Sequence, residues 1–287
     1  MQLNPILKRE VMVQSRSFTL PLMVSGVNLA LFLAALLGTF GILTRMRLSA
    51  EAMYGSFLLI YALVVGIGFL LLLFVTPSLT AGAISSERAS QTLDLLLMTQ
   101  LSPARIIAGK LLAAVWELCM LLCSGIPAMC LPLLYGGVGA GDVLLMLLVF
   151  AAEAAVLLCI GLYASSLSVH TVRVTAAAYG ITAGICIGLP ALCLLISPFC
   201  QSGNNYSAYL LLLDPLMNVL CLLESQTGYA GLFSELFYGL SLEPDPAFLR
   251  FFVPLSLAVQ VTAGFFLLLL TVVNITPRHA VRRTARW

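Results

Sequence analysis

Two acidic residues fall inside segments of the chain that are otherwise almost entirely apolar. Glu117 and Glu153 each lie near the middle of a long hydrophobic run. If these runs cross a membrane, a charged side chain at that depth costs about 2.5–3.5 kcal/mol or more. Each carboxyl is therefore expected to be protonated, hydrogen-bonded or turned toward an aqueous cavity. Two interpretations stay open: contact with a substrate or cation on a pathway, or a hydrogen bond between helices.

The densest group of charged residues lies between two other apolar runs, in residues 76–105 and just beyond them. Residues 84–98 combine polar and leucine-rich positions, so we expect an amphipathic helix or a helix pair there. Ser102-Pro103 is typical of an N-cap followed by proline at the first helical position, where a new helix starts. A helix, a tight break and a capped helix together predict a stiff element rather than a plain loop.

No catalytic motif accompanies these charges. A P-loop needs GxxxxGK[ST], but here Gly109-Lys110 is followed by Leu111 and Ala104 replaces the first glycine. The chain has two histidines and contains neither an HExxH motif nor paired glutamates. The sequence therefore predicts no enzyme, no metal site and no cofactor on this chain, and any ATP that it uses must be bound by another chain.

The composition is that of a membrane protein. Of the 287 residues, 61% are apolar and only 9% are charged, and the mean hydropathy is +1.07. Soluble domains are about one-quarter charged. We expect one all-α polytopic membrane domain over residues 1–287. Its six predicted transmembrane helices cover residues 20–43, 57–75, 106–134, 143–162, 174–196 and 252–273.

The remaining segments are expected to lie at the membrane surfaces. Residues 1–19 predict an interfacial amphipathic helix rather than a cleaved signal peptide, and residues 76–105 join the second and third spans. Residues 198–251 are too long for a simple connection. They predict short re-entrant or interfacial external helices, with a loop packed on the helix ends as the alternative. Residues 274–287 form a basic tail.

Prolines are expected to disturb two of the spans. Pro77 is expected to kink or end the second span, and Pro127 and Pro132 predict a kink or break near the far end of the third.

The lysines and arginines divide unevenly between the two sides. Eleven lie on the side of the termini, in the first 19 residues, the 76–105 segment with Lys110, the connection at Arg173 and the tail, and three lie on the other side. By the positive-inside rule the richer side is cytoplasmic. We therefore expect a multi-pass protein of a bacterial cell membrane, with both termini in the cytoplasm.

Small residues suggest two further contacts. Gly180, Gly184 and Gly188 repeat every four residues, which indicates a smooth helix face. Packing inside the subunit is the favoured interpretation, and a subunit contact or a pathway lining is the alternative. Cys200 and Cys221 are both predicted to be external, and whether they form a disulfide stays open.

The charged segment resembles that of a known family. The pairs Glu87-Arg88, Thr92-Leu93, Leu96-Leu97, Leu101-Ser102 and Gly109-Lys110, behind a proline, resemble the pattern of membrane subunits of ATP-binding-cassette (ABC) export transporters of the six-helix type V class. The order of elements along the chain is similar too. The resemblance implies that the segment after the second span carries a coupling helix that docks on an ATPase. The implied coupling residues are Ser86, Glu87, Arg88, Gln91, Thr92, Asp94, Ser102, Pro103, Arg105 and Lys110.

The same resemblance implies the partners. A separate ABC ATPase subunit would bind ATP and Mg, and a second copy of this permease or a homologous permease would complete the substrate pathway. Membrane lipid surrounds the subunit, and no nucleic acid is expected. The alternative is a proton- or cation-coupled secondary transporter that uses Glu117 and Glu153. The substrate stays open among lipid, peptide, drug and ion.

Overall fold

The computed structural model describes residues 5–14, 17–48, 54–93, 98, 102–135, 138–196, 206–228 and 246–276. All regular structure within these ranges is helical. Asp94, Cys200 and most of the 274–287 tail lie outside them, as do residues 198–205 and 229–245 of the 198–251 segment.

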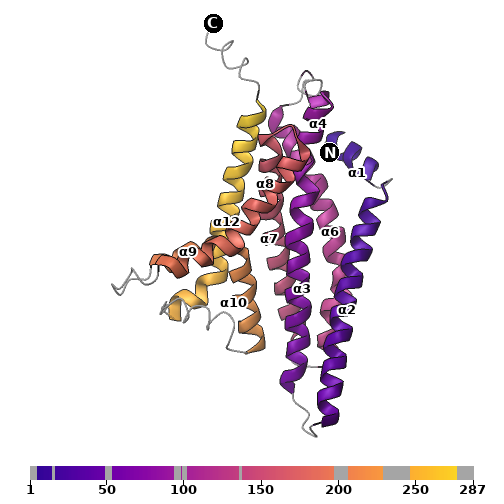
Figure 1. The fold of residues 1–287 in the computed structure, drawn as a ribbon, viewed down its shortest axis with the longest axis vertical. Coiled ribbons are helices and arrows are strands. Elements are labelled where there is room, and N and C mark those ends of the chain that lie inside the picture. The colour runs from indigo at the N-terminus through magenta and orange to yellow at the C-terminus, as the bar shows by residue number, and fades with distance from the viewer. Residues whose placement is uncertain are drawn as a thin grey trace.

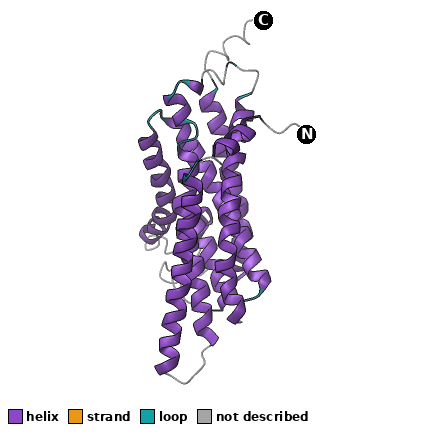
Figure 2. Cartoon of the chain, turned by 90° about the vertical axis from the view of Figure 1, so that its right-hand side faces the viewer, coloured by secondary structure: helices purple, strands orange, loops and turns teal. Residues whose placement is uncertain are grey.

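Six long apolar helices form an elongated bundle (Figures 1 and 2). Each has the length and composition needed to cross a membrane, which confirms the prediction of a polytopic helical membrane protein. They are α2 (Thr19–Leu48), α3 (Tyr54–Ala81), α6 (Pro103–Tyr135), α7 (Ala140–Leu167), the series α8 (Thr171–Ala183), η1 (Gly184–Gly188) and α9 (Leu189–Ile196), and α12 (Pro246–Ile275).

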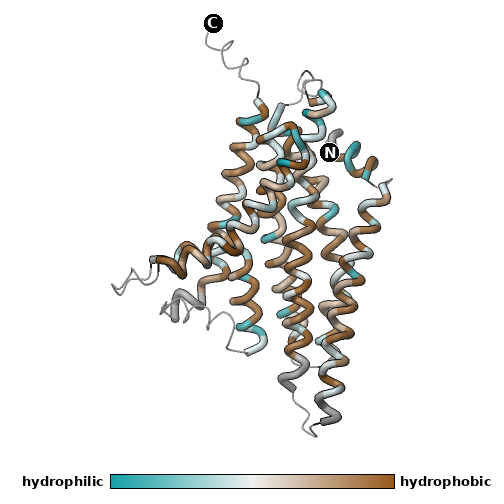
Figure 3. The backbone as a smooth tube through the Cα atoms, in the orientation of Figure 1, coloured by the Kyte–Doolittle hydropathy of each residue, from teal (hydrophilic) through white to brown (hydrophobic). Residues whose placement is uncertain are grey.

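Shorter helices lie at the two ends of this bundle. Helices α1 (Pro5–Gln14) and α4 (Ser85–Ala89) lie at the same end as the last turns of α12, here called the α4 end (Figure 1). Helix α10 (Pro215–Thr227) lies toward the opposite end (Figure 1), and the 3₁₀ helix η3 (Tyr206–Leu213) before it packs against α9, α10 and α12. Hydrophilic residues are prominent in α1 and α4, while the middles of the long helices are hydrophobic (Figure 3).

Helix α7 is the centre of the bundle, because it packs against α3, α6, α8, α10 and α12. At Gly161 it lies close to α3, because an added Cβ would collide with Thr80 Oγ1 and lie 3.0 Å from the Pro77 carbonyl oxygen. Thr80 Oγ1 also donates to the Leu158 carbonyl oxygen at 3.1 Å. Only glycine leaves room for this crossing, so the α3–α7 contact is fixed by one missing side chain.

The prolines disturb the helices less than the sequence indicates. Helix α3 continues through Pro77 to Ala81, and α6 continues through Pro127 and Pro132 to Tyr135. Of the two alternatives at each site, the end of the second span at Pro77 and the break in the third span are therefore wrong, and a kink at these prolines stays a prediction. A proline removes one backbone hydrogen bond, and the surrounding helices and hydroxyl groups compensate for that loss in a tightly packed bundle.

Candidate functional site

Helix α4 is attached to α7 through its first backbone groups. The amides of Ile84 and Ser85 donate to Ser165 Oγ of α7, at 2.8 and 3.0 Å. A short helix leaves its first amides without partners inside the helix, and this hydroxyl supplies one. Ile84 is buried in a small apolar cluster with Leu162 and Ile275. Hydrogen bonds and apolar contacts therefore hold the start of α4 against the end of α7, in addition to its chain connection to α3.

Glu87 joins α4 to two more helices. Its Oε1 lies 2.9 Å from Lys110 Nζ of α6, and the same Nζ lies 3.2 Å from Glu10 Oε1 of α1. The Lys110 side chain is only 5% exposed and that of Glu87 is 12% exposed. An ion pair shielded from water to this degree costs several kcal/mol when one partner is removed. The three residues therefore form a buried charged joint between α1, α4 and α6.

Arg88 binds in the opposite direction, toward the ends of α7 and α12. Its Nη1 donates to the Ser166 carbonyl oxygen at 2.8 Å and its Nη2 to the Asn274 carbonyl oxygen at 3.3 Å. The last carbonyls of a helix have no partner within the helix and carry the negative end of its dipole, so a guanidinium group suits them. Glu87 and Arg88 together connect α4 to α1, α6, α7 and α12.

Both side chains of the Glu87-Arg88 pair bind within the chain. The coupling role that the resemblance implies for them stays a prediction. Lys110 is likewise buried in the joint. The neighbouring small and polar residues Ser86, Ser90 and Gln91, in α4 and just after it, are exposed.

The chain reverses direction sharply after α4. Gln91 has a φ of 57°, which is uncommon for a residue other than glycine. Thr92 Oγ1 is 2.9 Å from Ser90 Oγ and donates to the Glu87 carbonyl oxygen at 3.3 Å.

Helix α6 begins at Pro103, as predicted. The exposed Ser102 precedes it, and its carbonyl oxygen accepts from the amides of Arg105 and Ile106 at 2.9 and 3.2 Å. The Arg105 side chain is exposed at the same end of the molecule.

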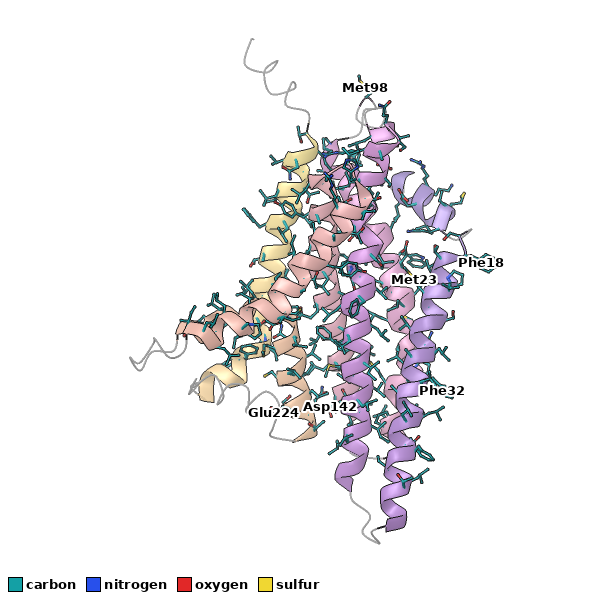
Figure 4. The ribbon with its side chains drawn as sticks, in the orientation of Figure 1. Phe18, Met23, Phe32, Met98, Asp142 and Glu224 are labelled. Atoms are coloured by element: carbon teal, nitrogen blue, oxygen red, sulfur yellow. The ribbon has the colours of Figure 1, made fainter. Side chains whose placement is uncertain are left out.

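Exposed apolar side chains flank α4. Met98 is 87% exposed and projects beyond the last turns of the bundle (Figure 4), and Val172 at the start of α8 is 81% exposed. Helix α8 contacts α4 directly. The α4 end therefore presents a surface of mixed character, defined here as Ser86, Ser90, Gln91, Met98 and Val172.

The two buried acids lie in different surroundings. Glu153 of α7 is fully buried, and its Oε1 accepts from Asn218 Nδ2 of α10 at 2.6 Å. Glu117 of α6 is 6% exposed, and its Oε1 has no hydrogen-bond partner among the residues that the structure describes. Only Glu153 borders a cavity between α7, α8, α10 and α12. The structure therefore does not bring the two predicted acids into one site.

Several polar residues of this region are not evident from the sequence. Asp214 caps α10, because its Oδ1 accepts from the Leu216 amide at 2.9 Å. Burial raises the pKa of Asp214 to about 8, and the nearby Glu153 adds to this effect. Asp214-Pro215 marks a break in an apolar run, but nothing in the sequence indicates that the acid is fully buried.

At the opposite end of the bundle, Gln226 joins three helices. It accepts from Tyr61 Oη of α3 at 2.7 Å and donates to the Asp142 carbonyl oxygen of α7 at 2.8 Å. Asp142 and Glu224, labelled in Figure 4, mark this end of α7 and α10. Helix α10 is thus held firmly against the bundle.

The glycine face does not pack inside the subunit. Gly180, Gly184 and Gly188 are exposed, and a Cβ built on any of them meets no atom within 4 Å in the part of the chain that is described. Gly184 to Gly188 form a π-helical turn. Packing of this face inside the subunit, which the sequence favours, is therefore not observed. Contact with another subunit or a pathway lining stays a prediction.

Helix content, span number and buried polar groups together define a polytopic α-helical membrane protein. No family model matches the chain, and no curated protein matches its sequence. Within the described ranges, no group of three or more His, Cys, Asp or Glu residues is placed to hold a metal ion.

Proposed function

We propose that this chain is the permease subunit of an ATP-driven exporter. Two such subunits, identical or homologous, would form the substrate pathway, and separate ATPase subunits would drive it from the α4 end. The observation that carries the proposal is the attachment of α4, a five-residue helix that binds α6, α7 and α12 through two adjacent charged side chains and is linked to α1 through Lys110.

The mechanism follows from these attachments. A partner that pushes or turns α4 moves the Glu87–Lys110 ion pair, and with it α1 and α6. Through Arg88 and Ser165 the same displacement reaches the ends of α7 and α12. ATP-driven closure of two ATPase subunits would then favour one of two helix arrangements, inward-facing or outward-facing, by the difference in binding free energy between them.

The α4 end also offers a surface for such a partner. The mixed surface of Ser86, Ser90, Gln91, Met98 and Val172 leaves two large apolar side chains in contact with water. An ATPase groove that covers them would gain about 25 cal/mol per Å² of apolar area removed from water. The eleven basic residues predicted on this side favour a cytoplasmic location for it.

The test changes residues of this exposed surface and leaves the buried joint of Glu10, Glu87 and Lys110 unchanged. The chain is co-expressed with an ABC ATPase subunit, sought among the products of the genes beside its own, and the complex is purified. Ser86→Arg with Gln91→Arg should reduce the co-purified ATPase at least about tenfold, because both added charges lie in the docking surface. Thermal stability of the permease should not change. Ala140→Arg, an exposed position at the opposite end, is the matched control.

Full co-purification and full ATPase stimulation with the Ser86→Arg, Gln91→Arg variant would contradict docking at α4. If no ATPase co-purifies with the wild-type chain, the proposal as a whole is contradicted.

A second candidate function is proton- or cation-coupled secondary transport. It is favoured by the full burial of Glu153 and by its Oε2 atom, which has no hydrogen-bond partner. Transport in vesicles that lack any ATPase distinguishes the two functions. Uptake driven by a pH gradient in such vesicles, and abolished by Glu153→Gln, would favour the secondary transporter.

A further inference from the structure

Helix α1 packs against the bundle along one face. Within residues 7–14, the half-buried side chains recur at spacings of three and four residues, which places them on the same side of a helix: Leu7, Glu10, Val11 and Gln14. The main neighbour of α1 is α6. Glu10 binds Lys110 of α6, which lies about 10 Å along the helix axis from Pro103, the first residue of α6. This ion pair fixes the height at which α1 lies beside the bundle.

Apolar side chains around α1 indicate that this height is that of the membrane surface. Helix α1 lies beside the bundle, next to the beginning of α2, the first span (Figure 1). Phe18, just before α2, is 88% exposed and points away from the bundle (Figure 4), and Leu22 in the first turn of α2 is exposed too. Trp116, which follows Lys110 in α6, is also exposed. Tryptophan is enriched at the level of the lipid headgroups. The surroundings of α1 are therefore those of a headgroup layer.

The exposed face of α1 combines two cations with apolar side chains. Lys8 and Arg9 come first, and Met12 and Val13 follow one turn later. Residues four positions apart are neighbours on a helix, so Lys8 lies beside Met12 and Arg9 beside Val13. Neither cation forms an ion pair with an acidic side chain in the part of the chain that is described. With Phe18, these four residues are here called the α1 surface. It offers two positive charges next to an apolar strip.

We propose that the α1 surface binds an anionic phospholipid, with the phosphate at Lys8 and Arg9 and an acyl chain along Met12, Val13 and Phe18. Lysine and arginine side chains carry only donors, which match the acceptor oxygens of a phosphate group. The planar guanidinium group of arginine binds two such oxygens at once. Each cation near an anionic membrane surface strengthens binding about fivefold. The apolar side chains contact the hydrocarbon that begins below the headgroup.

Other ligand classes fit this surface less well. A lipid with a choline headgroup brings a positive charge toward the two cations. A free phosphate ion pairs with the cations but leaves the apolar strip in contact with water. An acidic segment of a partner protein matches the charges, but Phe18 lies at the start of a span, where lipid covers an outward-facing side chain. Only an anionic lipid matches both halves of the α1 surface.

The α1 surface is connected to the charged joint. Glu10 follows Arg9 in the same helix and binds Lys110, which binds Glu87 of α4. A lipid bound to α1 would therefore hold one side of the joint in place. Lipid binding itself does not depend on an ATPase, whereas an effect of the lipid on transport rests on the proposed function. The two fail separately, because lipid binding is measured on the purified chain alone and docking is measured on the complex.

The test measures lipid binding to the purified full-length chain by native mass spectrometry, from detergent micelles that contain dioleoylphosphatidylglycerol or dioleoylphosphatidylcholine. These lipids have the same acyl chains and differ in net charge. Lys8→Gln with Arg9→Gln removes both charges of the α1 surface, and Phe18→Ser shortens its apolar strip. Arg173→Gln, at an exposed cation of the same end, is the matched control. Excess inorganic phosphate, added as a competitor, distinguishes a lipid site from a site for free phosphate.

We expect wild type to bind phosphatidylglycerol at least about fivefold more tightly than phosphatidylcholine. The Lys8→Gln, Arg9→Gln variant should lose most of this preference, and Arg173→Gln should keep it. Phe18→Ser should weaken the binding of both lipids and keep the preference, because both charges remain. Phosphate should not displace phosphatidylglycerol. In nanodiscs, phosphatidylglycerol in place of phosphatidylcholine should raise the thermal midpoint of wild type more than that of the double variant.

Equal binding of the two lipids by wild type would overturn the proposal, and so would an unchanged preference in the double variant. Displacement of phosphatidylglycerol by phosphate would overturn it as well, because the cations would then bind a free anion. Loss of co-purified ATPase from a double variant that keeps its lipid preference would assign the α1 surface to the ATPase instead.

Discussion

The charged joint at the α4 end and the region around Glu153 differ in how their buried polar groups are paired. In the joint, one lysine binds two glutamates and one arginine binds the carbonyl oxygens of two helix ends, although Glu87 Oε2 is buried without a partner among the described residues. Around Glu153, one side-chain oxygen each of Glu153, Asp214, Asn218 and Gln260 is buried without a partner among the described residues. The charges of the joint are therefore paired within the chain and hold helices together, whereas the region around Glu153 leaves four side-chain oxygens unpaired.

Loss of the lysine should break the joint most severely. Lys110→Met would leave the Glu10 and Glu87 carboxylates close together without a cation. Because Glu10 is 26% exposed, we expect a loss of about 2–3 kcal/mol in the free energy of unfolding, somewhat less than for a fully buried pair. Unfolding in detergent, followed by far-UV circular dichroism, measures it.

The matched control is Arg173→Ala, an exposed cation at the same end of the molecule, which should change stability by less than about 0.5 kcal/mol. Equal losses for the two variants would show that the joint contributes no more than an ordinary surface charge.

A smaller loss should follow from changing the arginine. Arg88→Lys keeps the charge but replaces a two-pronged donor with a single ammonium group, which reaches one carbonyl oxygen at a time. We expect a loss of about 1 kcal/mol in stability. In the assembled transporter, we also expect less transport per ATP hydrolysed, because α7 and α12 are then held less firmly to α4. If Arg88→Lys keeps wild-type stability and the same transport per ATP hydrolysed, Arg88 has no part in the proposed mechanism.

The polar groups beside the cavity should respond to pH in a defined direction. The folded-state pKa of Asp214 is about 8, above its ordinary value of 3.8. The folded chain therefore keeps a proton that the unfolded chain releases, and stability falls as pH rises from about 4 to about 8. The slope from this group is at most about 1.4 kcal/mol per pH unit.

Asp214→Asn removes this titration and keeps an oxygen to accept from the Leu216 amide. The thermal midpoint of the variant should therefore fall less between pH 5 and pH 7.5 than that of wild type. Both chains are compared in a Glu153→Gln background, so that the neighbouring acid does not contribute. Parallel pH profiles would mean that Asp214 is ionised in the folded protein.

The smallest change to the chain is a single cysteine, and its labelling shows on which side of the membrane the joint lies. Single cysteines at Ser90 and Ala140, in a cysteine-free background, lie at exposed positions on opposite ends of the bundle. We expect an impermeant thiol reagent to label Ala140→Cys in intact cells and to label Ser90→Cys only after lysis. The reverse pattern would place α4 outside the cell and exclude a cytoplasmic ATPase.

Local signals predict the helices well and the contacts between them poorly. The six spans follow from composition, and the start of α6 follows from Ser102-Pro103. The pairing of Glu87 with Lys110, or of Glu153 with an amide 65 residues away, depends on how helices pack, which no local pattern encodes. For the same reason Pro77 misleads: tertiary packing keeps α3 helical where the local rule predicts an end.

The π turn at Gly184–Gly188 changes the direction in which the side chains of α9, the helix that follows it in the same span, point around the helix axis. A π turn holds one residue more than an α turn, and one residue corresponds to about 100° of rotation around the helix. Cys193 is fully buried against η3, α10 and α12 only with this offset. If the same five residues formed an α-helical turn instead, with none removed, α9 would be rotated by about that angle. Cys193 would then point away from its cluster, and an exposed position of α9 would take its place.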